Sequence, residues 1–369
     1  MPPVGPLDAA VSKIAPVFVG ARSRAVAHYR STAVRSRSGI ALAVLEMAGV
    51  VPSSSWIVGR VSWSDTDVAI VPIGPPGTPP RIIVKWPSSG DSLASLRTQS
   101  ANLVRLHADQ RLTGWSSLVP VILFEGEADG IPFFVESAVP GITADRLRRD
   151  TAVRRRSLRA AAEAIAGLHA RTAVQRTVDD EILELWIGRP VRTVSELISS
   201  RGGGIAAVRA LDVLARELRA AFAGRELSIG WIHGDYWLGN ILTSPDGSRV
   251  TGIVDWDLAS SDQPVLLDPV HLVLMARRSL SGREFGDVVR SFLKEGSLAP
   301  AERAALHASS AVQLSDPGEI RRAIQFAWLR HVGIFAAAGK DGSNPRWVRR
   351  NIEAVLKALP DVVRASRPR

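Results

Sequence analysis

The 369-residue sequence contains no cysteine, three methionines and two tyrosines. The absence of cysteine excludes a disulfide framework, thiolate metal sites and a cysteine nucleophile. No window approaches the roughly 18 consecutive apolar residues that a membrane span needs. The N-terminus also lacks a charged segment followed by an unbroken apolar stretch, so we do not expect a signal peptide. Together these absences predict a cytoplasmic protein with no membrane partner.

Lysine is scarce as well, although the chain is basic. The net charge is +10, but only five of the 46 basic residues are lysine. Arginines cluster briefly at 146–159 and 346–350, and no zinc-finger spacing or RNP-like motif accompanies them. Solvated helix faces account for such clusters, and we therefore expect no nucleic-acid partner. Against this background a lysine inside an apolar strand, Lys85 in RIIVKW, stands out as a candidate functional residue.

The apolar content of 46% is enough for a large core and for two lobes. Residues 1–50 are predicted to be a helical, basic segment of unknown role. Residues 51–137 alternate short β-branched runs with one helix, and residues 138–369 are mainly helical. We therefore predict an α+β fold with a small antiparallel-sheet lobe and a large helical lobe, joined by an extended connector near 136–141.

The predicted small lobe has the order β-β-β-α-β-β. Its predicted strands fall within 56–63, 68–73, 81–86, 118–126 and 131–139, and its helix spans 92–110. The large lobe is predicted to contain a compact β element at 238–256 and late helices near 268–279, 283–294, 300–310, 318–338 and 345–358.

The stretch WIHGDYWLGNIL, residues 231–242, places polar side chains in an otherwise apolar run. Two short apolar runs follow it and flank PDG (245–247), which is a strong turn signal because proline presets φ and glycine accepts positive φ. The pattern predicts a hairpin, whose outer ends meet. Asn240 and Asp255 should therefore lie together, beside Asp235. Carboxylate and amide oxygens are ligands that Mg²⁺ favours, and a cation would explain a carboxylate in apolar surroundings.

The pattern HGD-x-x-x-x-N (233–240) followed by IVDWD (253–257) resembles the catalytic and metal-binding segments of the aminoglycoside phosphotransferase and choline kinase family. That family has the bilobal protein-kinase-like fold. The resemblance, which covers about residues 55–360, implies ATP- and Mg²⁺-dependent phosphate transfer to a hydroxyl of a small molecule. It implies that Asp235 is the catalytic base and that Asn240 and Asp255 hold Mg²⁺.

The same resemblance extends to the small lobe. Lys85 occupies the place of the strand lysine that pairs with ATP phosphates, and Glu136, Ser137 and Ala138 occupy a connector whose main chain contacts adenine. One departure is that the helix after the lysine should carry a glutamate to pair with it, but Gln99 is the best-placed residue.

A second departure concerns the turn that should cover the nucleotide. It is SWSDTD (62–67) and is not glycine-rich. Ser62 and Ser64 are expected to cradle phosphate there, whereas Asp65 and Asp67 would repel it if they pointed inward.

Several polar residues near the motif are expected to be structural. His233 is expected to orient the loop, and His169 to be part of the core. By resemblance Asp268, in DPVHL, supports the catalytic loop. Asp257 is either a metal residue or a surface residue.

The acceptor is left open by the sequence: a sugar, an amino alcohol and an aminoglycoside-like antibiotic all remain. Residues 231–275 hold six acidic side chains against one basic, which suits Mg²⁺ or a cationic acceptor. Residues beyond 140 carry 34 basic and 26 acidic side chains, which favours a neutral hydroxylated molecule. Trp328, Arg330, His331 and Trp347 serve either to bind a sugar or as core and surface residues.

A different class of function also remains open. The missing helix glutamate and the glycine-poor turn are compatible with a non-catalytic nucleotide-binding pseudokinase that has a regulatory role. The choice between ATP and GTP and the oligomeric state are not determined by the sequence.

Overall fold

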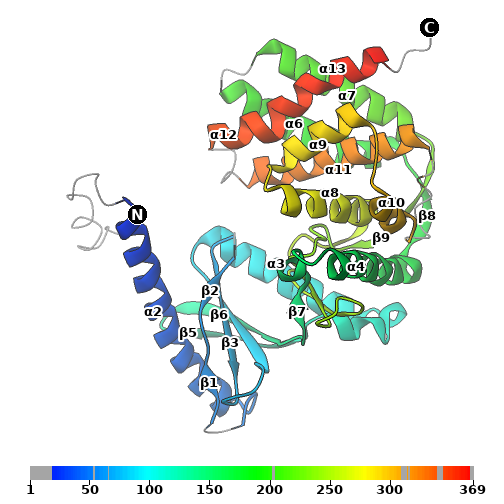
Figure 1. Cartoon of the computed structure of the whole chain (residues 1–369). Coiled ribbons are helices and arrows are strands. Elements are labelled where there is room, and N and C mark those ends of the chain that lie inside the picture. Colours follow the sequence, from blue (N-terminus) through cyan, green and yellow to red (C-terminus); the bar gives the residue numbers. More distant parts are fainter. Residues whose placement is uncertain are drawn as a thin grey trace. The chain divides into compact units, whose positions relative to one another are not determined.

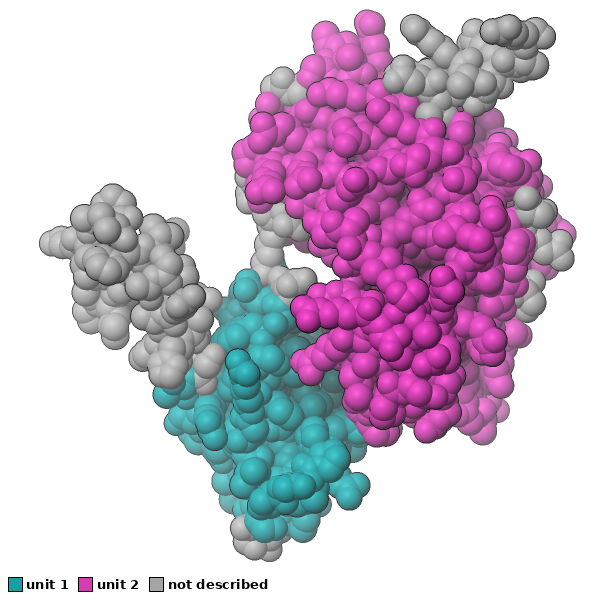
Figure 2. Space-filling view, viewed as in Figure 1, with its two compact units in different colours: residues 1–97, 122–138 teal, residues 98–121, 139–369 magenta. Residues whose placement is uncertain are grey.

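The computed structural model describes residues 19–52, 55–64, 66–201, 204–308, 314, 316–338 and 344–365. The chain divides into two compact units (Figure 2). Unit 1 comprises Met1–Arg97 and Ile122–Ala138, and unit 2 comprises Thr98–Val121 and Val139–Arg369.

Unit 1 is built on one antiparallel sheet with the strand order β1-β3-β4-β6-β5, and β2 pairs with β3 (Figure 1). Its elements follow the order predicted from the sequence, except that the first predicted strand, 56–63, is two short strands. The elements are α2 (Val19–Met47), β1 (Ile57–Val58), β2 (Ser62–Trp63), β3 (Val68–Gly74), β4 (Ile82–Pro87), the first part of α3 (Gly90–Ala108), β5 (Ile122–Ala128) and β6 (Ile131–Ser137).

The two faces of this sheet are covered by different helices. Val84 and Trp86 of β4 lie on one face, in a core shared with α2, and the Trp86 indole N–H donates to the Ser38 hydroxyl at 3.1 Å. Phe134 of β6 lies on the other face and packs with Leu96 of α3. Alternation along a strand places Lys85, which is paired with Phe134, on this second face. Within the predicted N-terminal helical segment, α2 therefore contributes side chains to the core of unit 1. Residues 1–18 lie outside the described part.

Unit 2 is mainly helical and also contains two small sheets. Strand β10 (Ile241–Thr243) lies between β11 (Val250–Ile253) and β7 (Ile142–Thr143), and β9 (Glu226–Ile232) lies between β12 (Ser260–Pro264) and β8 (Val174–Thr177). The helices are α4 (Thr151–Thr172), α5 (Asp180–Leu183), α6 (Arg189–Ser200), α7 (Ile205–Phe222), α8 (Leu267–Ser281), α9 (Phe285–Glu295), α10 (Pro300–His307), α11 (Pro317–Ala337), α12 (Pro345–Val348) and α13 (Ala354–Ala365).

The sheet of β8, β9 and β12 was not predicted. The sequence assigned the region before 238 to helices, but 174–177 and 226–232 are strands. Strand β8 has the sequence VQRT, in which valine is the one apolar residue, and all four residues are exposed. Its sequence therefore has no alternation of apolar and polar residues that could reveal a strand. Four of the five late helices, by contrast, lie within a few residues of their predicted positions, whereas the fifth, predicted at 345–358, consists of α12, a π-helical turn and α13 and extends to 365.

The second half of α3 belongs to unit 2, although the sequence placed all of 51–137 in the small lobe. Its contacts explain the difference. The amide of Asn102 donates to the carbonyls of Trp256 at 2.9 Å and Ala259 at 3.1 Å. Arg105 stacks its guanidinium 4.9 Å from the ring of Trp231. One helix therefore contributes to both cores.

None of the described helices combines the length and the apolar character that crossing a membrane requires.

Candidate active site

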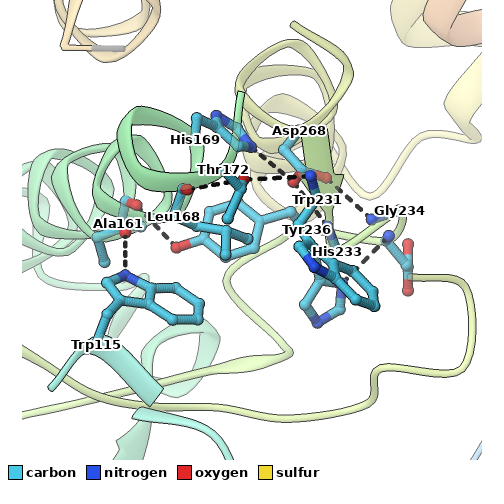
Figure 3. Close-up of polar contacts among 12 residues, drawn as sticks. Trp115, Ala161, Leu168, His169, Thr172, Trp231, His233, Gly234, Tyr236 and Asp268 are labelled. Atoms are coloured by element: carbon cyan, nitrogen blue, oxygen red, sulfur yellow. Dashed lines mark hydrogen bonds and ion pairs between the residues drawn. The ribbon is translucent and has the colours of Figure 1, made fainter. Parts of the chain in front are cut away.

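The loop 233–240 begins where β9 ends, and the buried carboxylate of Asp268 holds its first residues (Figure 3). The carboxylate accepts hydrogen bonds from the backbone N–H of His233 at 2.8 Å and of Gly234 at 3.0 Å. The Nε2–H of His169, a fully buried residue, donates to the same group at 3.2 Å. These contacts confirm the structural roles predicted for Asp268 and His169. Burial alone would raise the pKa of Asp268, but these donors hold it below its ordinary value.

A first prediction concerns the dependence of stability on Asp268. In Asp268→Asn one acceptor oxygen must serve three donors, so we expect a loss of about 1–3 kcal/mol of unfolding free energy at neutral pH. The folded-state pKa of Asp268 lies below its ordinary 3.8, so the carboxylate stabilises the fold above that pH. This contribution is lost as the pH falls through the folded-state pKa. Urea denaturation near pH 7 and near pH 3 measures the difference between wild type and variant.

We expect that difference to shrink on acidification. The matched control is Asp262→Asn, because Asp262 is exposed on β12 and should show little effect at either pH. A difference for Asp268→Asn that is equal at both pH values would contradict the role of its charge.

His233 orients the loop through both nitrogens of its ring. Its Nε2 lies 2.9 Å from the carbonyl oxygen of Val254, which can only accept, so Nε2 carries the proton. Its Nδ1 then accepts the backbone N–H of Asp235 at 3.3 Å. One ring nitrogen therefore bonds to the end of the hairpin at Val254 and the other to the loop at Asp235. The predicted orienting role is confirmed.

Gly234 is required by the path of the loop. Its φ is +84°, and a Cβ at this position would lie 2.1 Å from the carbonyl oxygen of Leu258. The Arg330 guanidinium donates to the carbonyl of Gly234 at 2.8 Å. The glycine of the HGD pattern therefore allows the loop backbone to approach the segment before β12 closely.

The side chain of Asp235 is held by two donors. Its Oδ1 accepts the Nε2–H of His271 at 2.9 Å, and its Oδ2 accepts the amide N–H of Asn240 at 3.1 Å. Burial alone would raise the pKa of Asp235, but the hydrogen bond and charge of His271 bring it well below its usual range. Asp235 is therefore an oriented carboxylate at neutral pH. Each oxygen keeps a lone pair that can accept a hydrogen bond from a hydroxyl.

The predicted hairpin is confirmed and brings Asn240 to the neighbourhood of Asp255. Ile241 is paired with Ile253, and the N–H of Val254 donates to the carbonyl of Asn240 at 2.9 Å. Asp255 follows with a φ of 72°, in the left-handed region that few non-glycine residues adopt. The structure thus brings Asp235 and Asn240 into contact, and Asp255 directly follows the residue whose N–H bonds to the Asn240 carbonyl.

The chemistry of these residues fits Mg²⁺. The amide nitrogen of Asn240 faces Asp235, and its amide oxygen accepts no hydrogen bond from the described residues. That oxygen and the carboxylate of Asp255 are hard ligands of the kind Mg²⁺ takes. Within the described ranges no three His, Cys, Asp or Glu side chains form a metal-binding group. That the three residues share one ion remains a prediction.

Lys85 has a carboxylate partner on the neighbouring strand. Its Nζ lies 2.9 Å from Oε1 of Glu136, and the two side chains are 8% and 5% exposed. Glu136 is paired with Ile83 and therefore lies on the same face of the sheet as Lys85. The sequence had assigned Glu136 only a main-chain contact. Within unit 1, its side chain on β6 places a carboxylate against Lys85, and the role of Gln99 stays a prediction.

The other residues predicted to bind nucleotide take part in local hydrogen bonds. The Ser64 hydroxyl accepts the N–H groups of Thr66 at 3.2 Å and Val68 at 3.1 Å, and Ser62 is exposed on β2. Ser137 ends β6, and the N–H of Ala138 donates to the carbonyl of Arg81 at 2.9 Å. Asp65 lies outside the described residues, and Asp67 is exposed. Nucleotide contacts by this set remain predictions.

Sequence reasoning missed His271 as a partner of Asp235. The signal was its spacing, because residues 268 and 271 lie three apart on one helix and therefore on the same face. Among the four residues considered for sugar binding, Trp328 belongs to the core. It is fully buried, and its indole N–H donates to the carbonyl of Asn351 at 2.8 Å. Asp257 is partly exposed, and its role stays open.

Comparison with known proteins identifies the class. A family model described as the phosphotransferase enzyme family (APH) matches residues 73–330, which is more than half of the chain. The chain belongs to this family and is a small-molecule phosphotransferase that uses a nucleotide and acts on hydroxyl groups. None of the curated proteins matches the sequence.

Solved structures confirm the protein-kinase-like fold of this family. A mutant of aminoglycoside 2'-phosphotransferase IIIa in complex with GDP aligns with 88% of this chain and 99% of its own, with a TM-score of 0.56 and 15% identity. Aminoglycoside phosphotransferase APH(2'')-Ib with bound ADP covers 86% and 97%, with a TM-score of 0.53 and 10% identity. A Ralstonia eutropha protein described as an aminoglycoside phosphotransferase covers 87% and 97%, with a TM-score of 0.52 and 14% identity. At these identities the likeness concerns the fold.

Proposed function

We propose that the chain catalyses the ATP- and Mg²⁺-dependent phosphorylation of a hydroxyl on a small molecule, with Asp235 as the catalytic base. The observation that carries this proposal is the state of Asp235. It is a carboxylate at neutral pH, it is fixed by His271 and Asn240, and it lines a recess of unit 2. Two side-chain donors that fix the orientation of one carboxylate are typical of a residue that acts on a bound molecule.

Asp235 accepts a hydrogen bond from the acceptor hydroxyl and so directs an oxygen lone pair toward the phosphorus. As the new O–P bond to the γ-phosphorus forms, the bond from that phosphorus to the β–γ bridging oxygen breaks, ADP leaves, and the hydroxyl proton moves to the Asp235 carboxylate. The low pKa of Asp235 makes it a weak base, so this transfer is late. A loose phosphoryl-transfer transition state tolerates a late transfer, because positioning and charge stabilisation contribute most of the catalysis.

The remaining residues bind the nucleotide and the metal. Lys85 forms an ion pair with Glu136. When ATP binds, the Lys85 ammonium pairs with the ATP phosphates. Ser62 and Ser64 lie at the phosphate turn, and the main chain of Glu136, Ser137 and Ala138 receives the adenine. Asn240 and Asp255 hold Mg²⁺, which supplies charge neutralisation at the phosphate oxygens when it is bound.

The experiment that tests this function is an ADP-release assay with ATP and Mg²⁺ over sugars, amino alcohols and aminoglycosides, with product mass as a second readout. Phosphorylated product that requires Asp235 supports the proposal. Nucleotide binding without turnover on any acceptor or on water would instead favour the pseudokinase with a regulatory role.

A second prediction addresses the metal ligands. Asp255→Asn removes the charge from one proposed ligand, so we expect the Mg²⁺ concentration for half-maximal activity to rise about tenfold or more. The matched control is Asp129→Asn, an exposed turn residue with a φ of 54° that asparagine tolerates. An unchanged Mg²⁺ requirement in Asp255→Asn would remove this residue from the metal site.

A further inference from the structure

The recess beside Asp235 has walls that are apolar or aromatic. It is lined by side chains from the segment after the hairpin and from α8 and α11, including Leu258, Leu267, Ala327, Ile334 and Phe335. Two imidazoles, His271 and His331, and the guanidinium of Arg330 complete it. Among these lining residues Asp235 is the one carboxylate, and His271 and Asn240 already engage its oxygens.

A series of neighbouring rings, each tilted against the next, leads from His271, the partner of Asp235, to a partly exposed tryptophan. The ring of His271 lies 5.7 Å from Phe285, and Phe285 lies 4.1 Å from His331. His331 lies 4.6 Å from Phe335, which lies 6.1 Å from Trp347. Phe285 is buried, whereas Phe335 and Trp347 are partly exposed. The rings therefore continue from the catalytic carboxylate to positions that a bound molecule can reach.

The charges of the residues that line the recess do not favour binding of a cation. Burial and the neighbouring His271 and Arg330 hold the pKa of His331 well below its usual value, so its ring is neutral at physiological pH. The fixed positive charge is that of Arg330, which is anchored on the carbonyl of Gly234 beside the catalytic residue. A polycation here would meet Arg330 without a second carboxylate among the described lining residues to offset it.

We propose that the acceptor is an uncharged hydroxylated molecule that presents an apolar or ring face to Phe335 and Trp347 while its hydroxyl reaches Asp235. This inference rests on the proposed function of Asp235. Carbohydrate CH faces, aromatic rings and hydroxylated macrocycles share the required chemistry, because each combines a hydroxyl with an apolar surface that packs against aromatic rings. Polycationic aminoglycosides do not share it.

The test compares two sets of acceptors with the purified full chain, ATP and Mg²⁺. One set contains uncharged ring compounds with hydroxyls, namely aryl glucosides, nucleosides and amine-free macrocyclic lactones. The other contains polycationic aminoglycosides. We expect kcat/KM for the best uncharged compound to exceed that of every aminoglycoside by at least about tenfold. A higher kcat/KM for an aminoglycoside would overturn the inference.

Variants of the ring wall give an independent readout. Phe335→Ala and Trp347→Ala should each raise KM for the uncharged acceptor about tenfold and leave KM for ATP unchanged. Phe335→Leu keeps an apolar side chain and should recover part of the loss, and thermal melting verifies that each variant is folded. Ile205→Ala, at a 71% exposed position at the start of α7, is the control and should change neither KM. An unchanged acceptor KM in both ring variants would also overturn the inference.

Hydrolysis of ATP by water separates this inference from the proposed function. If ATP turnover is lost in Asp235→Asn but no uncharged compound is phosphorylated, the acceptor inference is wrong and the function stands. If no turnover depends on Asp235 with any acceptor or with water, the proposed function fails and the inference falls with it.

Discussion

Asp235→Asn is expected to lower kcat by about 10²–10⁴-fold while nucleotide affinity stays close to that of the wild type. The amide has nearly the shape of the carboxylate, but it has one acceptor oxygen instead of two and carries no charge. His271 and Asn240 both donate to this group, so the single oxygen of the asparagine must serve both donors and the acceptor hydroxyl. Its nitrogen can only donate and cannot take the proton.

The measurement is steady-state ADP release combined with calorimetric titration of ADP. The Asp129→Asn variant is the matched control, since the same chemical change on an exposed turn of unit 1 should leave kcat unchanged. Loss of nucleotide binding in Asp235→Asn would show that this residue contributes to binding and not to the chemical step. Unchanged turnover would remove Asp235 from the mechanism.

The hairpin that carries Asn240 and Asp255 could be predicted because it is local. The turn residues at 245–247 fix which strands pair, and the N–H of Gly247 closes the turn on the carbonyl of Ser244 at 2.8 Å. A short loop leaves few alternative registers, so the neighbourhood of the two residues follows from the sequence. The contact of Asn240 with Asp235 is local as well, since only four residues separate them within one loop.

The partner of Lys85 could not be predicted, because 51 residues separate it from Glu136. Apolar alternation shows which residues of a strand share a face, but it does not give the register between two distant strands. A shift of one residue would have turned Glu136 away from Lys85 and toward the core that α2 covers. His271 illustrates a different limit. Its helix face was determined by its spacing from Asp268, but the identity of the facing loop depended on tertiary structure.

The ion pair of Lys85 and Glu136 predicts that removing one partner destabilises the protein more than removing both. In Lys85→Met the Glu136 carboxylate stays buried without its counter-charge or must take up a proton. We expect about 3–5 kcal/mol of lost unfolding free energy. Glu136→Leu should also destabilise the protein, because it removes the carboxylate that lies 2.9 Å from the buried ammonium. The double variant replaces both charges with apolar side chains on one face of the sheet and should be closer to the wild type than either single variant.

Turnover should follow a different order. All variants that lack Lys85 lose the charge proposed to bind the ATP phosphates, so we expect kcat/KM for ATP to fall about 10²–10³-fold in Lys85→Met and to stay low in the double variant. Glu136→Gln keeps Lys85 and a hydrogen-bonding side chain, and it should raise KM for ATP more than it lowers kcat. Urea denaturation and ADP release on the wild type and the four variants measure both orders. If stability and activity recovered together in the double variant, the pair would be structural and Lys85 would have no part in binding ATP.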